Sequence, residues 1–169
     1  ALPQKNIAVL LLERLLKGKV KSVQRMNVVQ AKKYSEMLKN SIDKYNKRSI
    51  QTSKVIEELI EIAKEMRKAA ERGEDLGLSQ DEVAFYDALA DHMTAKEVLG
   101  DETLRAIAHE LTKVIKENMT IDWNRKESAR AKMRITVRRL LREYGYPPDL
   151  AKMAVETVVR QAELMAGNS

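Results

Sequence analysis

The sequence predicts an all-α protein in which one very long helix in the N-terminal half packs against several shorter helices. Apolar side chains recur along most of the chain at steps of three and four residues, the spacing that gives a helix one apolar face. Glycine and proline, which interrupt helices, are scarce, with 6 and 3 copies in 169 residues. No stretch shows the alternation of apolar and polar residues that is typical of a half-buried strand. We therefore expect helices and no sheet.

The N-terminal half predicts two helices of very different length. The first is a short leading helix within residues 1–20, which we expect Gly18 to end. The second is a long helix over residues 22–74, because the apolar or small positions keep the helical spacing across the whole segment. The polar stretch NKRSIQTS, residues 46–53, has weak helix propensity and is the place where this helix could kink or break. The stripe of the leading helix consists of Ile7, Leu10, Leu11 and Leu15.

The C-terminal half, residues 79–166, predicts a bundle of shorter helices with clear end signals. Ser79 and Glu82 have the spacing of a capping box, in which each side chain hydrogen-bonds a free amide at the helix start. A later helix over 127–144 begins with a similar pair, Asn124 and Glu127, and Gly145 supplies its left-handed stop. Its apolar stripe consists of Met133, Val137, Leu140, Leu141 and Tyr144. Two prolines then precede a closing helix that runs to about Gly167, with Ala151, Val155, Val158 and Ala162 as its apolar positions. All 169 residues are expected to form a single domain.

The composition excludes several classes of function. The chain has no cysteine, so disulfides, thiolate metal sites and thiol catalysis are impossible, and a reducing cytoplasm is the expected location. The most apolar stretch, IAVLLLERLL, is interrupted by Glu13 and Arg14 and falls short of the roughly 18 residues that cross a bilayer. The chain opens within a helical pattern and without an initiator methionine, so we expect a piece of a larger protein.

Motifs for catalysis and cofactors are missing. The sequence contains neither the glycine-rich phosphate loop that ends in Gly-Lys-Ser/Thr nor the Gly-x-Gly-x-x-Gly turn of dinucleotide-binding proteins. AHELTK resembles the start of a His-Glu-x-x-His zinc helix, but Lys113 occupies the position of the second histidine. His92 and His109 therefore read as surface residues. The glutamates of residues 57–65 lack the Glu-x-x-His partners of a carboxylate metal bundle, so they read as a solvated face. We expect no catalytic residue, no cofactor and no metal in this chain.

Charge is unevenly distributed and points to possible partner contacts. Between residues 17 and 48 there are 10 Lys and Arg against 2 acids, and residues 57–105 carry 14 acids against 6 bases. Residues 120–145 are basic again, with 8 Lys and Arg against 3 acids. A polyanion or an acidic protein surface could engage both basic segments, or these charges could be solvated or paired with the acidic middle. Trp123 is either an interface anchor or a core residue. The candidate contact residues are Lys32, Lys33, Trp123, Arg130, Lys132, Arg134, Arg138, Arg139 and Arg142.

Two long stretches carry a resemblance to a known family. Residues 28–90, from VVQAKKYSEMLKN to DEVAFYDALA, and residues 121–149, IDWNRKESARAKMRITVRRLLREYGYPPD, resemble the C-terminal helical domain of the R subunit of type I restriction enzymes. The resemblance covers roughly residues 5–164 and keeps the order of the elements. It implies a parent subunit with a nuclease domain and two helicase-like motor lobes upstream, where ATP and Mg²⁺ would bind.

For this chain the resemblance implies a role in assembly. The C-terminal helices of the family are thought to dock the motor subunit onto the methyltransferase core of M and S subunits. A basic, aromatic-poor surface suits reversible, electrostatically guided docking. The alternative is a module that binds the DNA backbone through its lysines and arginines without reading sequence. REYGYPPDL, with two prolines and no short glycine-centred turn, argues against a helix-turn-helix that reads bases.

Overall fold

The computed structural model describes residues 2–91, 93–118 and 127–167, and this part of the chain is helical without a strand. The helices are α1 (Leu2–Gln24), α2 (Val28–Asn46), α3 (Thr52–Leu76), α4 (Gln80–Ala90), α5 (Met93–Leu99), α6 (Asp101–Asn118), α7 (Glu127–Glu143) and α8 (Pro148–Gly167). They form two compact units. Unit 1 contains the described residues up to Gln24 together with Gln30–Arg72, and unit 2 contains Arg25–Val29 and the described residues from Gly73 onward. The all-α prediction is confirmed for the described residues, and the expectation of a single domain stays a prediction.

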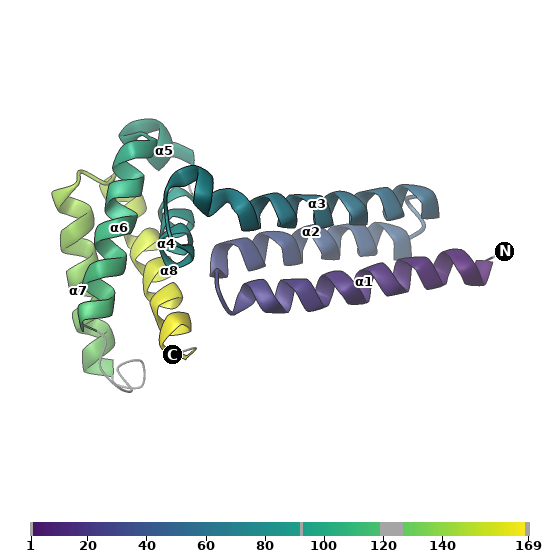
Figure 1. Ribbon diagram of the computed structural model, residues 1–169, viewed down its shortest axis with the longest axis horizontal. Coiled ribbons are helices and arrows are strands. Elements are labelled where there is room, and N and C mark those ends of the chain that lie inside the picture. Colours follow the sequence, from purple (N-terminus) through teal and green to yellow (C-terminus); the bar gives the residue numbers. More distant parts are fainter. Residues whose placement is uncertain (1, 92, 119–126, 168–169) are drawn as a thin grey trace. The chain divides into compact units, whose positions relative to one another are not determined.

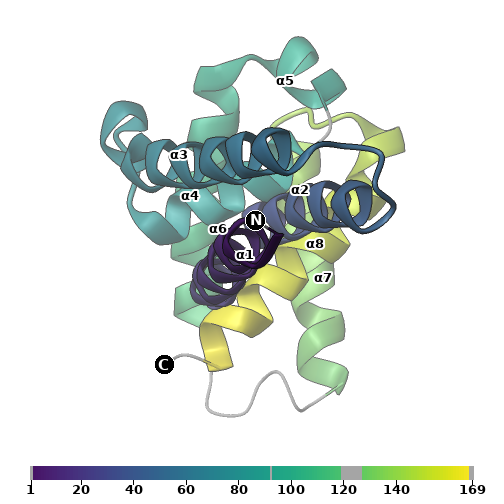
Figure 2. The same cartoon turned by 90° about the vertical axis from the view of Figure 1, so that its right-hand side faces the viewer.

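Unit 1 is a bundle of three helices, α1, α2 and α3, which lie side by side in Figure 1, and Figure 2 views the bundle from the N-terminal end of α1. Helices α2 and α3 run antiparallel, because Ser41 Oγ donates to Glu58 Oε1 at 2.7 Å while Tyr34, earlier in α2, reaches the carbonyl of Glu65, later in α3, at 3.3 Å. Apolar residues from all three helices fill the bundle. The buried ones are Val9, Leu16, Tyr34, Leu38, Val55, Leu59, Ile62 and Met66.

The predicted long helix over residues 22–74 is wrong, because the chain breaks at two places in that segment. Helix α2 ends at Asn46, and Arg48 takes a left-handed conformation with φ 56° before α3 begins at Thr52. This break lies within the polar stretch NKRSIQTS. The break lets α3 fold back on α2, so that the apolar faces of the two helices bury each other. In one continuous helix these two faces could not contact each other.

The predicted boundaries of the leading helix are also wrong. Gly18 lies inside α1, which continues to Gln24. A glycine inside a helix costs about 1 kcal/mol relative to alanine. Val20 and Val23, which follow it, pack against the core of unit 1, and their burial offsets this cost. The chain turns instead at Asn27, whose side chain is buried and donates to Asp87 Oδ2 at 2.7 Å.

Unit 2 is built around α4, which is buried from Val83 to Leu89. Helices α6 and α8 pack against it, and α7 packs along α6 and α8. The predicted capping box at the start of α4 is confirmed, with Glu82 N donating to Ser79 Oγ at 3.2 Å and Ser79 N donating to Glu82 Oε1 at 2.9 Å. The buried Gln161 of α8 accepts from Val28 N at 2.9 Å and donates to Met26 O at 2.8 Å, so segment 25–29 is fixed to this unit.

The two C-terminal helices agree closely with the sequence. Helix α7 ends at Glu143, and Gly145 follows with φ 76°, as the left-handed stop requires. Met133, Val137 and Leu141 of the predicted stripe are buried, while Leu140 is half-buried and Tyr144 is 36% exposed. Tyr146 is buried in place of Tyr144. Helix α8 begins at Pro148 and ends at Gly167. Its predicted positions Val155, Val158 and Ala162 are buried, while Ala151 is half-buried. The predicted pair Asn124 and Glu127 lies partly outside the described residues.

Candidate docking surface

The basic flank of α7 is divided between paired and unpaired arginines. Arg134 lies beside α8 and contacts Glu156 through two nitrogens, at 2.8 and 3.4 Å. The hydrogen bonds to Glu156 raise the pKa of Arg134 above its ordinary value. Arg130, one turn earlier, lies 3.8 Å from Glu163 of the same helix. These two arginines therefore hold α7 against α8, and their charges are largely neutralised.

Arg138 and Arg142 continue the same flank toward the end of α7. Both are exposed, and neither has an ion-pair partner in the part of the chain that the structure describes. They line a groove at the corner between α7 and α8, to which α8 contributes Lys152. Arg134, Arg138 and Arg142 are spaced four residues apart and therefore share one flank of α7. Contact with α8 divides this flank into a paired half and an open half.

The other predicted residues do not join this groove. Lys132 and Arg139 are exposed on α7 and are not among the side chains that line the groove. Lys32 and Lys33 are exposed on α2, in unit 1, and Lys33 Nζ lies 5.7 Å from the ring centroid of its neighbour Tyr34. Trp123 lies outside the described residues. The structure therefore brings together two of the predicted cations, Arg138 and Arg142, and adds Lys152, which the sequence did not single out.

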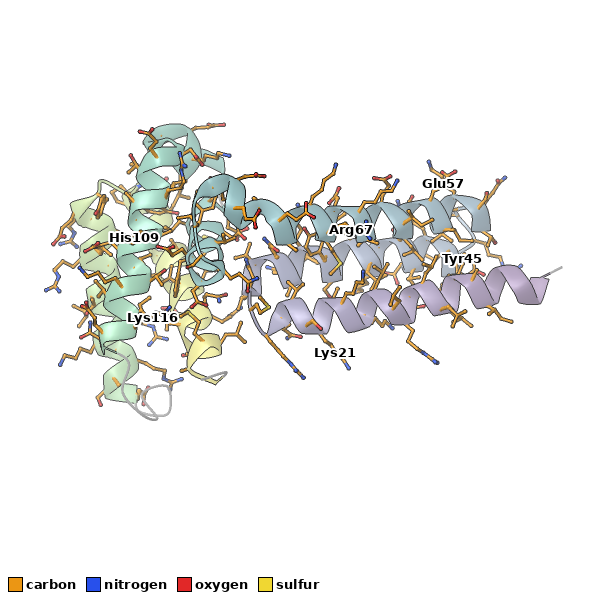
Figure 3. The ribbon with its side chains drawn as sticks, in the orientation of Figure 1. Lys21, Tyr45, Glu57, Arg67, His109 and Lys116 are labelled. Carbon is orange, nitrogen blue, oxygen red and sulfur yellow. The ribbon has the colours of Figure 1, made fainter. Side chains whose placement is uncertain are left out.

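Two side chains of α6, His109 and Lys116, contact the acidic start of α4, and Figure 3 labels both of them. His109 Nδ1 contacts Glu82, and Lys116 Nζ lies 3.0 Å from Asp81. Burial raises the pKa of the Glu82 carboxyl, but hydrogen bonds from Ser79 and from His109 outweigh burial and leave this pKa below its ordinary value. His109 is exposed, as expected, and its partner is a helix-capping carboxylate. Glu82 therefore caps the start of α4 and also contacts the imidazole of α6.

Helix α1 carries an exposed apolar surface, which we did not predict from the sequence. Its predicted stripe faces away from the core of unit 1, since Ile7, Leu10, Leu11 and Leu15 are 52–62% exposed. The opposite side of the helix contributes Val9 and Leu16 to the core. A helix that is apolar on both sides is usually covered on both, so the outer stripe is an unusual surface. The sequence IAVLLLERLL, residues 7–16, does indicate a second apolar face, because it has more apolar residues than one face of a helix can hold.

Features of other functional classes are missing from the described residues. No three His, Cys, Asp or Glu side chains come close enough to hold a metal ion within residues 2–91, 93–118 and 127–167. Three glutamates of α3 instead pair with lysines: Glu57 with Lys54, Glu58 with Lys44 and Glu61 with Lys64, each at 3.6 Å. Among the helices described, none has the length and apolar character that would let it cross a membrane.

Comparisons with known proteins find relatives of this chain among the endonuclease subunits of type I restriction enzymes. It is 36% identical over 164 residues, 97% of its length, to the type I restriction enzyme HindI endonuclease subunit of Haemophilus influenzae. It is 35% identical over 136 residues, 78% of its length, to the putative type I restriction enzyme MjaIXP endonuclease subunit of Methanocaldococcus jannaschii. The chain spans 16% and 13% of the length of these two relatives. No solved structure gives a significant match.

The sequence model of a protein family matches almost the entire chain. The family described as type I restriction enzyme HindI endonuclease subunit-like, C-terminal, matches residues 1–168. The two units, the basic corner of α7 and α8 and the outer stripe of α1 all fall within this match. The chain therefore belongs to the C-terminal family of HindI-like type I restriction endonuclease subunits.

Proposed function

We propose that this chain is a non-catalytic docking domain, which holds a type I restriction endonuclease subunit on the methyltransferase core of M and S subunits in the cytoplasm. The observation that carries the proposal is the extent of the match. The chain aligns over 97% of its length with an endonuclease subunit but spans 16% of it. The nuclease and the ATP-dependent motor of such a subunit then lie in the other regions, and ATP and Mg²⁺ bind there.

The charges on the surface support docking to a protein. Arg138 and Arg142 are exposed and have no partner in the described part of the chain, so an acidic surface can approach them without first displacing an internal carboxylate. Exposed charges of this kind steer association and select partners, while they contribute modestly to final affinity. A subunit that joins and leaves a core complex needs contacts of this type.

Binding to the DNA backbone is the competing function, and the ion pairs of α7 weigh against it. A protein that follows a phosphate backbone needs unpaired cations along the whole track, because each neutralised phosphate releases counterions. On α7 this track is interrupted where Arg134 and Arg130 pair with Glu156 and Glu163. The basic flank is therefore a short cluster at one helix end and not a continuous strip.

A binding experiment separates the two functions. The purified chain is titrated with the methyltransferase core of its own restriction system, with and without duplex DNA of arbitrary sequence as a competitor. We expect the chain to bind the core without DNA, and to bind DNA alone no more tightly than about 10⁻⁴–10⁻⁶ M, the usual range of non-specific affinity at physiological salt. Retention of DNA with a steep salt dependence, together with no binding to the core, would replace docking by the DNA-backbone function.

A further inference from the structure

The corner between α7 and α8 forms a groove with cationic walls and an apolar floor. It encloses about 430 Å³, a volume within the range of about 300–1,000 Å³ that binding pockets commonly have. Arg138 and Arg142 stand one helical turn apart on the α7 side, and Lys152 stands on the α8 side. The remaining lining residues are Gly145, Tyr146, Pro148 and Ala151. No carboxylate lines this groove.

Two hollows of similar size in unit 1 differ in their charges. The hollow between α2 and α3 encloses about 560 Å³ and contains lysines that are already paired, with Lys54 and Lys44 each 3.6 Å from a glutamate of α3. The hollow between α1 and α2 encloses about 410 Å³ and is lined by Glu13, which lies 2.9 Å from Lys17. Carboxylates stand beside the lysines in both hollows. The groove of α7 and α8 differs because no carboxylate of the described residues lines it, so its cations can bind an anion from outside the chain.

The excess of positive charge in the groove comes from side chains and not from helix ends. The N-terminus of α8 has a partial positive charge and the C-terminus of α7 a partial negative charge, and both lie at this corner. These two contributions largely cancel. Stabilisation of the α7 terminus can explain a cation at Arg142, in the last turn, but it does not explain Arg138 or Lys152.

We propose that this groove binds an acidic segment of the methyltransferase core, with a carboxylate between Arg138 and Arg142 and an adjacent apolar side chain on the floor. The inference rests on the proposed docking function. Guanidinium groups one turn apart can grip a carboxylate through paired hydrogen bonds, and Lys152 adds attraction from the opposite wall. Pro148 and Ala151, which are more exposed than Tyr146, give the floor its accessible apolar surface, and an apolar side chain next to the acid can be buried there.

A nucleic acid fits these features less well than a protein segment does. Successive phosphates need unpaired cations over several helical turns, whereas the neighbours Arg134 and Arg130 on this flank are paired with α8. A base could stack on an exposed aromatic ring, but Tyr146 is 3% exposed and its ring cannot serve as a stacking platform.

Charge reversal in the whole chain tests the groove. We expect the double variant Arg138→Glu, Arg142→Glu to bind the methyltransferase core at least 10-fold more weakly than the unaltered chain does. The matched control is Lys113→Glu, Arg160→Glu, which changes the net charge by the same amount at two exposed positions of α6 and α8. We expect this control to lose less than about 3-fold. Equal loss in both variants would mean that total charge and not the groove determines binding, and would overturn the proposal.

A second variant tests whether the partner enters the groove. Ala151→Trp fills the floor without changing charge and should weaken core binding at least 10-fold, with a loss that persists at high salt. Circular dichroism and the melting temperature show whether this variant folds. If it does not fold, Lys152→Glu takes its place, because Lys152 is exposed on the opposite wall. Unaltered affinity of a folded Ala151→Trp or Lys152→Glu protein would overturn the proposal.

The outcomes distinguish failure of the groove from failure of the docking function. If the unaltered chain binds the core and the Arg138 and Arg142 variant binds equally well, docking survives and the groove proposal is wrong. If that variant keeps core binding but loses binding to duplex DNA, the groove holds phosphates and the proposal is also wrong. If the unaltered chain does not bind the core, docking fails. A poly-glutamate peptide then tests the groove alone, and binding that only the groove variants lose would support its affinity for acidic protein.

Discussion

Tyr146 shows how a single residue fixes the corner on which the groove depends. Its hydroxyl donates to the carbonyl of Leu89 at 2.7 Å. Leu89 lies in the last turn of α4, where carbonyl groups have no partner within the helix. The bond therefore satisfies a buried acceptor and positions the segment between α7 and α8. Burial raises the pKa of the Tyr146 hydroxyl to about 12, and the nearby Asp91 contributes to this shift.

This raised pKa predicts a loss of stability at alkaline pH. Between pH 10 and pH 12 the native state keeps the Tyr146 proton while the unfolded chain loses it, so the free energy of unfolding falls as pH rises through this window. Below pH 10 the contribution is fully present. Tyr146→Phe should cost about 1–3 kcal/mol at neutral pH, because the Leu89 carbonyl loses its donor. It should also make the decline between pH 10 and 12 shallower. Urea unfolding across that range would measure both effects, and parallel curves for the two proteins would contradict the assignment to Tyr146.

At the scale of elements, α1 has two apolar faces with different surroundings. Leu16 is fully buried among residues of α2 and α3, whereas Leu11 is 59% exposed on the outer stripe. The same chemical change in the same helix should therefore have very different consequences. The helix itself tolerates either change, because alanine has a helix propensity at least as high as that of leucine.

We expect Leu16→Ala to reduce the free energy of unfolding by about 2–5 kcal/mol, since it leaves a cavity in the core of unit 1. Leu11→Ala should change this free energy by no more than about 0.5 kcal/mol, as is usual for exposed positions. Thermal or urea denaturation of the two variants beside the unaltered chain measures the difference. A large loss from Leu11→Ala would show that the outer stripe is covered in solution, for example by a second copy of the chain.

For the molecule as a whole, the described residues contain helices, two cores and surface grooves, and they bring together no set of side chains suited to hold a metal. The sequence lacks a phosphate loop. Relatives of the chain are named as endonuclease subunits, of which it spans 16% and 13%. The activity in those names does not have to reside in this segment.

We expect the isolated chain neither to hydrolyse ATP nor to cleave DNA, with or without Mg²⁺. Release of phosphate from ATP and nicking of supercoiled plasmid are the two measurements. A contaminating enzyme is excluded by repeating the assay with a surface variant purified in the same way. Turnover that a point substitution in this chain abolishes would show that it carries catalytic residues.

The helical class, the capping box of Ser79 and Glu82, the stop at Gly145 and three of the four predicted core positions of α8 follow from the sequence alone. These features depend on local signals, namely the apolar period, the geometry of helix ends and the preferences of glycine and proline. Recognition of the family also came from the sequence, because long stretches keep the residues and element order of restriction subunits.

Which surfaces are covered and which charges are paired depends on contacts between helices that are distant in the chain. The apolar spacing of residues 22–74 is the same for one straight helix as for two that fold back, and the choice depends on the burial of Leu38 against Leu59 and Ile62 of α3. Similarly, Arg134 and Arg138 look equivalent in sequence, but Glu156 neutralises the first and no carboxylate reaches the second among the described residues. The residues that pack against a helix are distant from it in the chain. Apolar periodicity therefore predicts which face of a helix is buried but not which element packs against that face.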